Sequence, residues 1–486
     1  MRLTRRDMLA AILASGATQA FGAGPMPDVR PRRRGDGGAS SAIDTVQSMV
    51  DRAWLDGGKV SFAVADARTG EMLETRDPDL VQPPASTAKA LTTLYHLGVL
   101  GPDHRFETRL LATGPIFNGR IDGDLILAGG GDPTLDTSGL AELASALKDT
   151  GVREVGGYLR IWTGALPSIV EIDDEQPDHV SYNPSIGGLN LNFNRVHFGW
   201  KRVGADYQVD MDARAGRYIP GVTSARMAVV DRRGPIYTYR REEDVDDWTV
   251  ARTALGESGS RWLPIRHPGL YAGEVFQVLA RSNGIQIGGP VLRADAAEGT
   301  LLAQHHSGPS NAILKDMLEH STNITAEIMG LSASEKLGPV ESLPQSATRM
   351  GEWLKENYGL ENIAFEDHSG LGDDSRISAT DMTRAMVRAG PDGPLRAIMK
   401  PYPLNDRSLK VDAKTGTLNF VTALTGYITG PRGRPLAFSI FCSDTDRRDT
   451  LTVAQRERPE GGRAWANRSR TLQRALLARW ATLFGA

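Results

Sequence analysis

Cysteine is almost absent from this sequence of 486 residues: Cys442 is the single thiol, so no internal disulfide can form. It lies in the apolar run 436–443, where a buried, inert cysteine is favoured over a catalytic one. Neither sign of charge dominates, since 56 Lys and Arg residues stand against 59 Asp and Glu residues, a net charge of −3. No global basic field therefore points to a nucleic-acid partner.

Long apolar runs and metal-ligand patterns are missing as well. No segment approaches the roughly 18 uninterrupted apolar residues of a spanning helix, so we expect no integral membrane segment. The nine histidines show no His-Glu-x-x-His spacing, which disfavours a metalloenzyme, and we expect neither a metal nor a cofactor. The length predicts two to four domains, and a hydrophobic content of 40% is ample for a sizeable core.

The N-terminus carries an export pattern. Residues 1–23 combine three arginines with a short apolar stretch and small residues up to Ala20 and Ala23. This pattern is typical of a secretory signal peptide and is too short to span a bilayer. The Arg5-Arg6 pair resembles a twin-arginine export signal. We therefore expect an exported, periplasmic protein in which residues 24–40, rich in Pro, Arg and Gly, form a linker.

The rest of the chain predicts an α+β fold in three parts. Residues 41–102 contain a helical spacing, a pair of strands and a second helix from Ser86. Residues 103–295 are rich in Gly, Asp and β-forming residues, which predicts one or more inserted β-rich domains. Residues 296–486 return to helical periodicity and then strands, and they complete the domain that the first part begins.

The C-terminal part contains two strand candidates, residues 414–428 and 434–443, followed by a final helix from about 463 to 483. A strand pair near the N-terminus and a strand pair near the C-terminus, both flanked by helices, can share one sheet. We therefore expect an antiparallel sheet with helices packed against it.

Ser86-Thr-Ala-Lys89 is the first group of residues suited to catalysis. Residues three apart share one face of a helix, so the hydroxyl and the amine can meet. A neutral lysine can remove the serine proton when burial or a neighbouring cation lowers its pKa. The free N–H of Ser86 at the helix N-terminus can face an oxyanion. The spacing fits an N-cap serine with an exposed lysine equally well, and Ser145-Ala-Leu-Lys148 is expected to be such an ordinary helix surface.

Two more short motifs follow. Ser321-Thr-Asn323 stands between two helical stretches, so both side chains can project from one loop into a cleft; by itself it also fits a cap or turn. Lys414-Thr415-Gly416 begins a strand, where the glycine lets a substrate backbone lie close. Lys414 can hold a carboxylate, and the N–H of Thr417 can complete an oxyanion hole. An ordinary edge strand with a solvated lysine is the alternative.

In this order, the three motifs resemble the active-site set of penicillin-binding proteins and serine β-lactamases. Ser321 follows Ser86 by 235 residues and precedes Lys414 by 93, and the first gap is far too long for an ordinary β-lactamase. The insertion resembles the class C low-molecular-mass penicillin-binding proteins of the penicillin-binding protein 4 type, peptidase family S13. Further similar stretches extend the resemblance over most of residues 40–486: Gly-Asp-Pro-Thr-Leu at 131–135, the stretch 182–194 and Asp-His-Ser-Gly-Leu at 367–371.

The resemblance implies a penicillin-binding/β-lactamase-like transpeptidase domain and a serine D-alanyl-D-alanine carboxypeptidase, endopeptidase or both. It implies an acyl-enzyme at Ser86, with Lys89 as the base and Ser321 relaying a proton to the departing amine. The residues implied in substrate binding are Asn323, Lys414, Thr415, Gly416 and Thr417. Peptidoglycan stem peptides and β-lactams are the implied partners, and no cofactor is implied; the oligomeric state is left open.

The sequence departs from the family pattern around the expected cleft. Thr322 replaces a frequent Asp, His368 replaces a Gly, and Gly372-Asp373 stands where Ser-Arg is common, which adds negative charge. Residues 171–175 replace a segment rich in Trp and Asp. These changes bear on recognition of substrate side chains and not on the acyl chemistry. Two alternatives stay open: a β-lactamase or esterase on the same scaffold, and a non-catalytic wall-binding protein.

Overall fold

The computed structural model describes residues 44–485, so the expected signal peptide at 1–23 and linker at 24–40 lie outside the described residues. A five-stranded sheet with the order β2-β1-β22-β21-β20 is antiparallel at every pairing. Its strands are β1 (Lys59–Asp66), β2 (Met72–Arg76), β20 (Lys410–Leu418), β21 (Val421–Thr429) and β22 (Pro435–Ser443). The strand pair before Ser86 therefore joins the C-terminal strands, which confirms the expected shared sheet.

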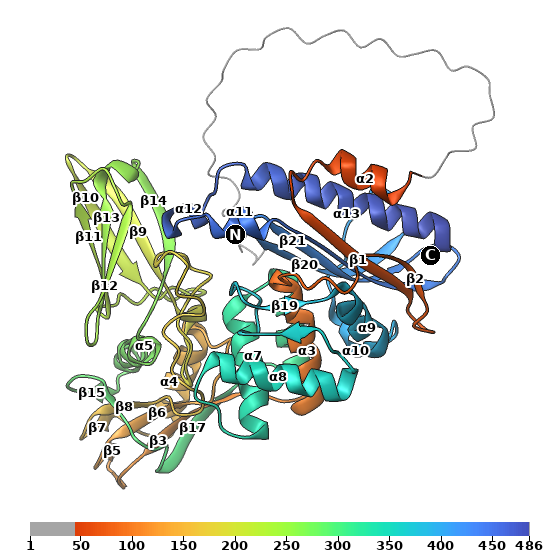
Figure 1. Cartoon of the computed structure of the whole chain (residues 1–486). Coiled ribbons are helices and arrows are strands. Elements are labelled where there is room, and N and C mark those ends of the chain that lie inside the picture. Colours follow the sequence, from red (N-terminus) through yellow and green to blue (C-terminus); the bar gives the residue numbers. More distant parts are fainter. Residues whose placement is uncertain (1–43, 486) are drawn as a thin grey trace. The chain divides into compact units, whose positions relative to one another are not determined.

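Helices cover both faces of this sheet because both faces are apolar. Along β1, Phe62 packs into the core on one face and Ala63 into the core on the other. On the first face lie α2 (Val46–Ala53) and α13 (Gly462–Phe484), as Figure 1 shows. The second face carries a helical layer made of α3 (Ala88–Val99), α6 (Ser310–His320), α7 (Asn323–Leu337), α8 (Leu343–Tyr358), α9 (Ala379–Ala389) and α10 (Pro394–Ile398).

The chain between α3 and α6 forms mixed sheets around a core of its own. Two of the sheets have the orders β16-β8-β6-β3-β17 and β15-β7-β5-β4. Their strands are β3 (Glu107–Ala112), β4 (Ile116–Phe117), β5 (Arg120–Ile121), β6 (Leu125–Gly129), β7 (Glu154–Val155), β8 (Leu159–Trp162), β15 (Gln286–Ile287), β16 (Leu292–Arg293) and β17 (Thr300–His306). The helices α4 (Thr137–Asp149) and α5 (Pro268–Ser282) pack in the same core.

Two three-stranded sheets complete this region, with the orders β10-β9-β14 and β11-β13-β12 (Figure 1). Their strands are β9 (Arg195–Val203), β10 (Asp206–Asp212), β11 (Ala225–Val230), β12 (Tyr237–Arg241), β13 (Asp246–Ala251) and β14 (Ser258–Pro264). The remaining elements are the small pair β18 (Ile363–Ala364) and β19 (Arg376–Ile377), α11 (Thr445–Asp449) and α12 (Val453–Arg456). Within residues 44–485, no helix has both the length and the apolar character needed to cross a bilayer.

One expected strand, residues 414–428, is a hairpin instead. β20 ends at Leu418 and β21 begins at Val421, and these two residues pair with each other. The turn between them is Asn419-Phe420, in which Phe420 adopts a left-handed φ of 56°. Phe420 is buried in the core under α13, so tertiary packing stabilises a turn that lacks the usual Gly or Pro signal. The sequence prediction was wrong here because the apolar pattern continues through the turn.

Candidate active site

Ser86 lies in a single 3-10 turn, Ala85–Thr87, that leads directly into α3. Ala85 holds a left-handed φ of 45°, and the Thr87 hydroxyl donates to the Pro84 carbonyl at 2.6 Å. Lys89 Nζ lies 3.0 Å from Ser86 Oγ, as the spacing of the two residues predicts. Strained backbone conformations persist only where the surroundings enforce them, and here the strain presents the serine hydroxyl at the start of a helix.

Lys89 is fully buried, and its amine contacts three acceptors from three parts of the chain. Besides Ser86, it donates to Asn323 Oδ1 and to the Ser369 carbonyl, each at 2.8 Å. Burial lowers the pKa of Lys89 to about 8, although the carboxyl groups of Glu327 and Asp367 act in the opposite direction. An amine with this pKa is partly neutral near physiological pH, which is what proton abstraction from a serine requires.

Two buried carboxyl groups that the sequence reasoning missed support this amine. Glu327 accepts the N–H groups of His368 and Ser369, each at 2.8 Å. Asp367 accepts N–H groups from the loop that follows it, which are those of Gly370, Leu371 and Gly372. Burial, and then the proximity of Asp367, raises the pKa of Glu327 to about 8. The signal for Glu327 was its place one helical turn after Asn323, on the same face of α7.

Ser321 and Asn323 flank the junction between two helices. Ser321 ends α6 in a left-handed conformation with φ of 59°, and Asn323 is the first residue of α7. The Asn323 amide accepts from Lys89 through its oxygen and donates to the Tyr182 carbonyl at 3.0 Å. The stretch 182–194 of the inserted region therefore reaches the same site.

Strand β20 forms the opposite wall of the site. Lys414 is only 2% exposed, and its amine donates to Ser321 Oγ at 2.9 Å and to the Thr415 carbonyl at 2.8 Å. Burial lowers the pKa of Lys414 well below 10.5, and the amines of Lys89 and Lys400 lower it further. Lys414 is thus not the solvated lysine of an ordinary edge strand.

Gly416 makes room for protein backbone. A Cβ at this position would lie 2.8 Å from the Pro84 carbonyl oxygen and 3.0 Å from the Ala85 Cβ. The absent side chain therefore lets β20 pack directly against the turn that carries Ser86. The close approach predicted for Gly416 is present, but its observed partner is the chain's own Pro84–Ala85 segment.

These residues open into a cleft of about 620 Å³. Ser86, Ser321, Asn323 and Thr417 line it, whereas Thr415 is exposed on the same strand. The other cleft-lining residues include Gln176, Tyr182, Leu371 and five arginines: Arg448, Arg456, Arg458, Arg463 and Arg470. Ser145 and Lys148, which share the spacing of Ser86 and Lys89, lie exposed on α4 as expected of a helix surface. Within residues 44–485, no group of His, Cys, Asp and Glu side chains is arranged to hold a metal ion.

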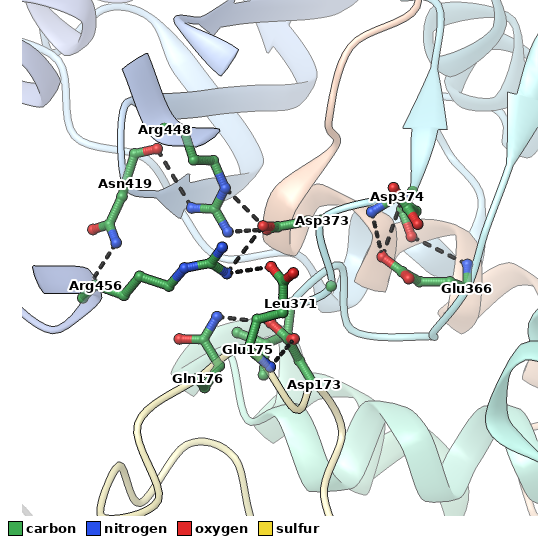
Figure 2. Close-up of polar contacts among 12 residues, drawn as sticks. Asp173, Glu175, Gln176, Glu366, Leu371, Asp373, Asp374, Asn419, Arg448 and Arg456 are labelled. Atoms are coloured by element: carbon green, nitrogen blue, oxygen red, sulfur yellow. Dashed lines mark hydrogen bonds and ion pairs between the residues drawn. The ribbon is translucent and has the colours of Figure 1, made fainter. Parts of the chain in front are cut away.

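Asp373, the departure expected to add negative charge, is paired with arginines (Figure 2). Arg448 forms an ion pair with Asp373 through two of its nitrogens. Arg456 contacts Asp373 at 3.1 Å and Glu175 at 2.6 Å, so it links the two carboxylates. Although burial alone would raise the pKa of Asp373, first Arg448 and then Arg456 hold it below its ordinary value. The charge of Asp373 is therefore neutralised within the wall of the cleft, which ties the inserted loop at 173–176 to the C-terminal segment.

Residues 42–457 match the D-Ala-D-Ala carboxypeptidase 3 (S13) family, and they include all three motifs. The chain belongs to that family. It is 28% identical over 448 residues to a D-alanyl-D-alanine carboxypeptidase from an Actinomadura species, covering 82% of this chain and 80% of the relative. It is 23% identical over 430 residues to the D-alanyl-D-alanine carboxypeptidase DacB of Haemophilus influenzae, covering 82% of this chain and 88% of the relative.

The fold is likewise shared with a solved structure. The crystal structure of penicillin binding protein 4 from Haemophilus influenzae superposes with a TM-score of 0.71, at 21% identity, over 90% of this chain and 100% of that one. This confirms the expected α+β penicillin-binding fold and the resemblance to the S13 family. As a member of this peptidase family, the chain is a serine-type D-Ala-D-Ala carboxypeptidase.

Proposed function

We propose that this S13 peptidase cleaves D-alanyl-D-alanine bonds of peptidoglycan stem peptides through an acyl-enzyme at Ser86. The observation that carries the proposal is the position of Lys89. Its amine contacts both Ser86 Oγ and the amide of Asn323, a residue 234 positions further along the chain. A structural lysine has no need of a serine hydroxyl on a strained turn, whereas a general base does.

The first half of the mechanism follows from these contacts. Neutral Lys89 accepts the proton of Ser86 Oγ while that oxygen attacks the carbonyl carbon of the penultimate D-alanine. In the proposed mechanism, the N–H groups of Ser86 and Thr417 stabilise the resulting oxyanion. Asn323 orients the peptide from one wall of the cleft, and Thr415 and Thr417 on β20 orient it from the other. Gly416 supports this arrangement, because its lack of a side chain lets β20 pack against the Pro84–Ala85 segment beside Ser86.

The second half uses the Ser321–Lys414 pair. The amine of the departing D-alanine must gain a proton when the C–N bond breaks. Ser321 Oγ, bonded to Lys414 Nζ at 2.9 Å, is the group that we assign to relay to this amine the proton that Lys89 took from Ser86. Water then attacks the acyl-enzyme, and Ser86 regains its proton as the peptide leaves. The same steps cleave a cross-linked peptide when the departing amine belongs to another stem, so carboxypeptidase and endopeptidase activity share this site.

β-Lactams are proposed to react at the same serine, since they present a reactive carbonyl in place of the D-alanyl bond. Support comes from the penicillin binding protein 4 structure of Haemophilus influenzae, which has also been solved with a bound β-lactam. Export is proposed from the pattern at residues 1–23. Cell fractionation of the full chain, with and without those residues, tests the export proposal. Recovery of both forms in the cytoplasmic fraction would contradict it.

The function is tested by labelling the protein with a fluorescent penicillin and mapping the modified residue by mass spectrometry. We expect a long-lived adduct on Ser86 that is absent from Ser86→Ala. Ser145→Ala, at the matching motif on α4, is the control and retains the adduct. Lys89→Ala should acylate far more slowly, since general-base catalysis contributes roughly 10²–10⁴ in rate. Rapid turnover of penicillin would instead indicate a β-lactamase. Absence of both the adduct and peptide cleavage would indicate a non-catalytic protein.

A further inference from the structure

Arg470 is the cleft-lining arginine that directly contacts a candidate substrate-binding residue, Thr417. Its guanidinium Nη2 donates to Thr417 Oγ1 at 3.0 Å, and both residues line the cleft. Arg463, Ala466 and Arg470 line it at helical spacing, while Trp465 and Leu472 point into the core beneath the sheet. Because α13 packs on the sheet, the side of this helix that carries Arg463, Ala466 and Arg470 faces the cleft, and Arg470 reaches β20.

Arg470 carries a charge that no acidic side chain compensates within the described part of the chain, residues 44–485. Among residues 44–485, no carboxylate forms an ion pair with it, and Thr417 is its hydrogen-bond partner. Arg448 and Arg456 differ, because Asp373 and Glu175 compensate them. A guanidinium has five N–H donors in a planar fork, so Arg470 keeps donors for a ligand after bonding Thr417. A carboxylate suits these donors, because its two oxygens can accept hydrogen bonds from two of them.

The sequence analysis assigned Lys414 to hold a carboxylate of the substrate, but the contacts of its amine make it less suited than Arg470 to that role. Its amine is directed at Ser321 Oγ and the Thr415 carbonyl, and its side chain is almost completely buried. Burial and the neighbouring Lys89 also lower its pKa, which favours the neutral form. Arg470 is half-buried at the cleft surface, where a substrate can reach it.

We propose that Arg470, together with the hydroxyl of Thr417, recognises the free carboxylate of the residue that leaves. The inference rests on the proposed function, because it places the scissile bond between Ser86 and the N–H of Thr417. The Thr417 hydroxyl accepts from Arg470, so its own hydrogen is available to the carboxylate. Arg470 is then a specificity residue that selects peptides ending in a free D-amino acid over those whose terminus is blocked.

The test compares two peptides, an N-acylated D-alanyl-D-alanine peptide with a free carboxylate and the same peptide as its C-terminal amide. For the wild type we expect a higher kcat/KM on the free acid. Arg470→Gln should lower kcat/KM on the acid by about 10- to 100-fold, the factor that corresponds to a charge-assisted hydrogen bond, and leave the amide little changed. Arg470→Lys should restore part of the preference.

Two variants of the same helix serve as controls. Arg474, one turn further along α13, lies over the ring of Tyr402 and outside the cleft, so Arg474→Gln should change neither substrate. Arg463→Gln removes the same charge from the cleft without a bond to Thr417. The inference would be overturned if Arg470→Gln left the ratio of kcat/KM on the acid to kcat/KM on the amide unchanged. It would also be overturned if Arg463→Gln lowered that ratio by the same factor. Neither result would contradict the proposed function. The proposed function would fail if the wild type cleaved neither peptide and formed no adduct at Ser86.

Discussion

Replacing Glu327 by Gln tests how the buried carboxyl groups control Lys89. The substitution keeps the size of the side chain and removes its charge. Glu327 accepts the N–H groups of His368 and Ser369 with one oxygen each, and Gln has a single oxygen. One of the two buried N–H groups must then face the NH₂ of the new amide. The loop that presents the Ser369 carbonyl to Lys89 is therefore weakened, and the charge that raises the pKa of Lys89 disappears.

Both effects have an expected size. An unpaired buried N–H costs about 1–3 kcal/mol of unfolding free energy. For the rate, neutral Lys89 is the active form, so acylation rises with pH through a midpoint near pH 8 and levels off at higher pH. A base with that pKa is roughly one-tenth neutral at pH 7, by the definition of the pKa. Because the pKa of Glu327 is also about 8, its carboxylate forms over the same pH range in which Lys89 loses its proton. The loss of that charge lowers the pKa of Lys89, so the midpoint should move below pH 8.

The assay is the second-order rate of penicillin acylation between about pH 6 and about pH 10, which includes about two units on either side of the wild-type midpoint. Urea unfolding of the same samples measures the stability change. Glu335→Gln is the control on the same helix, because Glu335 accepts a single N–H, that of Val340, which a Gln oxygen can also accept. A profile of Glu327→Gln whose midpoint stays in place or moves upward would refute the electrostatic link between Glu327 and Lys89.

Three further predictions concern stability and access. Asp373→Asn leaves the buried Arg448 without its carboxylate and should cost about 3–5 kcal/mol of unfolding free energy. Because the pKa of Asp373 is lowered, this contribution is present above about pH 4 and is lost as the pH falls through the folded-state pKa. Gly370→Ala places a Cβ 2.0 Å from the Ala85 carbonyl oxygen at a φ of 73°, and should cost more than about 2 kcal/mol and abolish penicillin labelling. Burial raises the pKa of Cys442 to about 11, so Ellman's reagent should react with it only after unfolding.

Two of these three predictions have a control variant, and the third has an outcome that would contradict it. The double variant Asp373→Asn/Arg448→Met should recover stability relative to the single change, and no recovery would contradict the ion-pair argument. Gly433→Ala has nearly the same φ, 76°, with open space around the new Cβ, so it measures the conformational cost alone. If Gly370→Ala and Gly433→Ala lowered the unfolding free energy equally, contact of the new Cβ with Ala85 would not contribute to the loss of stability. Rapid labelling of Cys442 in the folded protein would show that β22 is accessible.

Local sequence patterns predicted the elements that carry the site. The helix expected from about 463 to 483 is present as α13, with ends that differ by one residue, and the two helical stretches expected around Ser321-Thr-Asn323 are α6 and α7. The Ser-x-x-Lys spacing places hydroxyl and amine together because three residues make nearly one helical turn. The order of the three motifs, with the long gap after the first, was enough to predict the family and the fold. These features are encoded within a few residues of each other, or simply in their order along the chain.

Tertiary structure alone decided the chemistry of each group. Lys89 is a candidate base because burial lowers its pKa, and its buried amine contacts Asn323 and Ser369, which lie more than 200 residues away. Assembly of β20 beside the Ser86 turn also buried Lys414 and placed Arg470 against Thr417. Desolvation and long-range pairing depend on which surfaces meet, so one local stretch of sequence does not contain them.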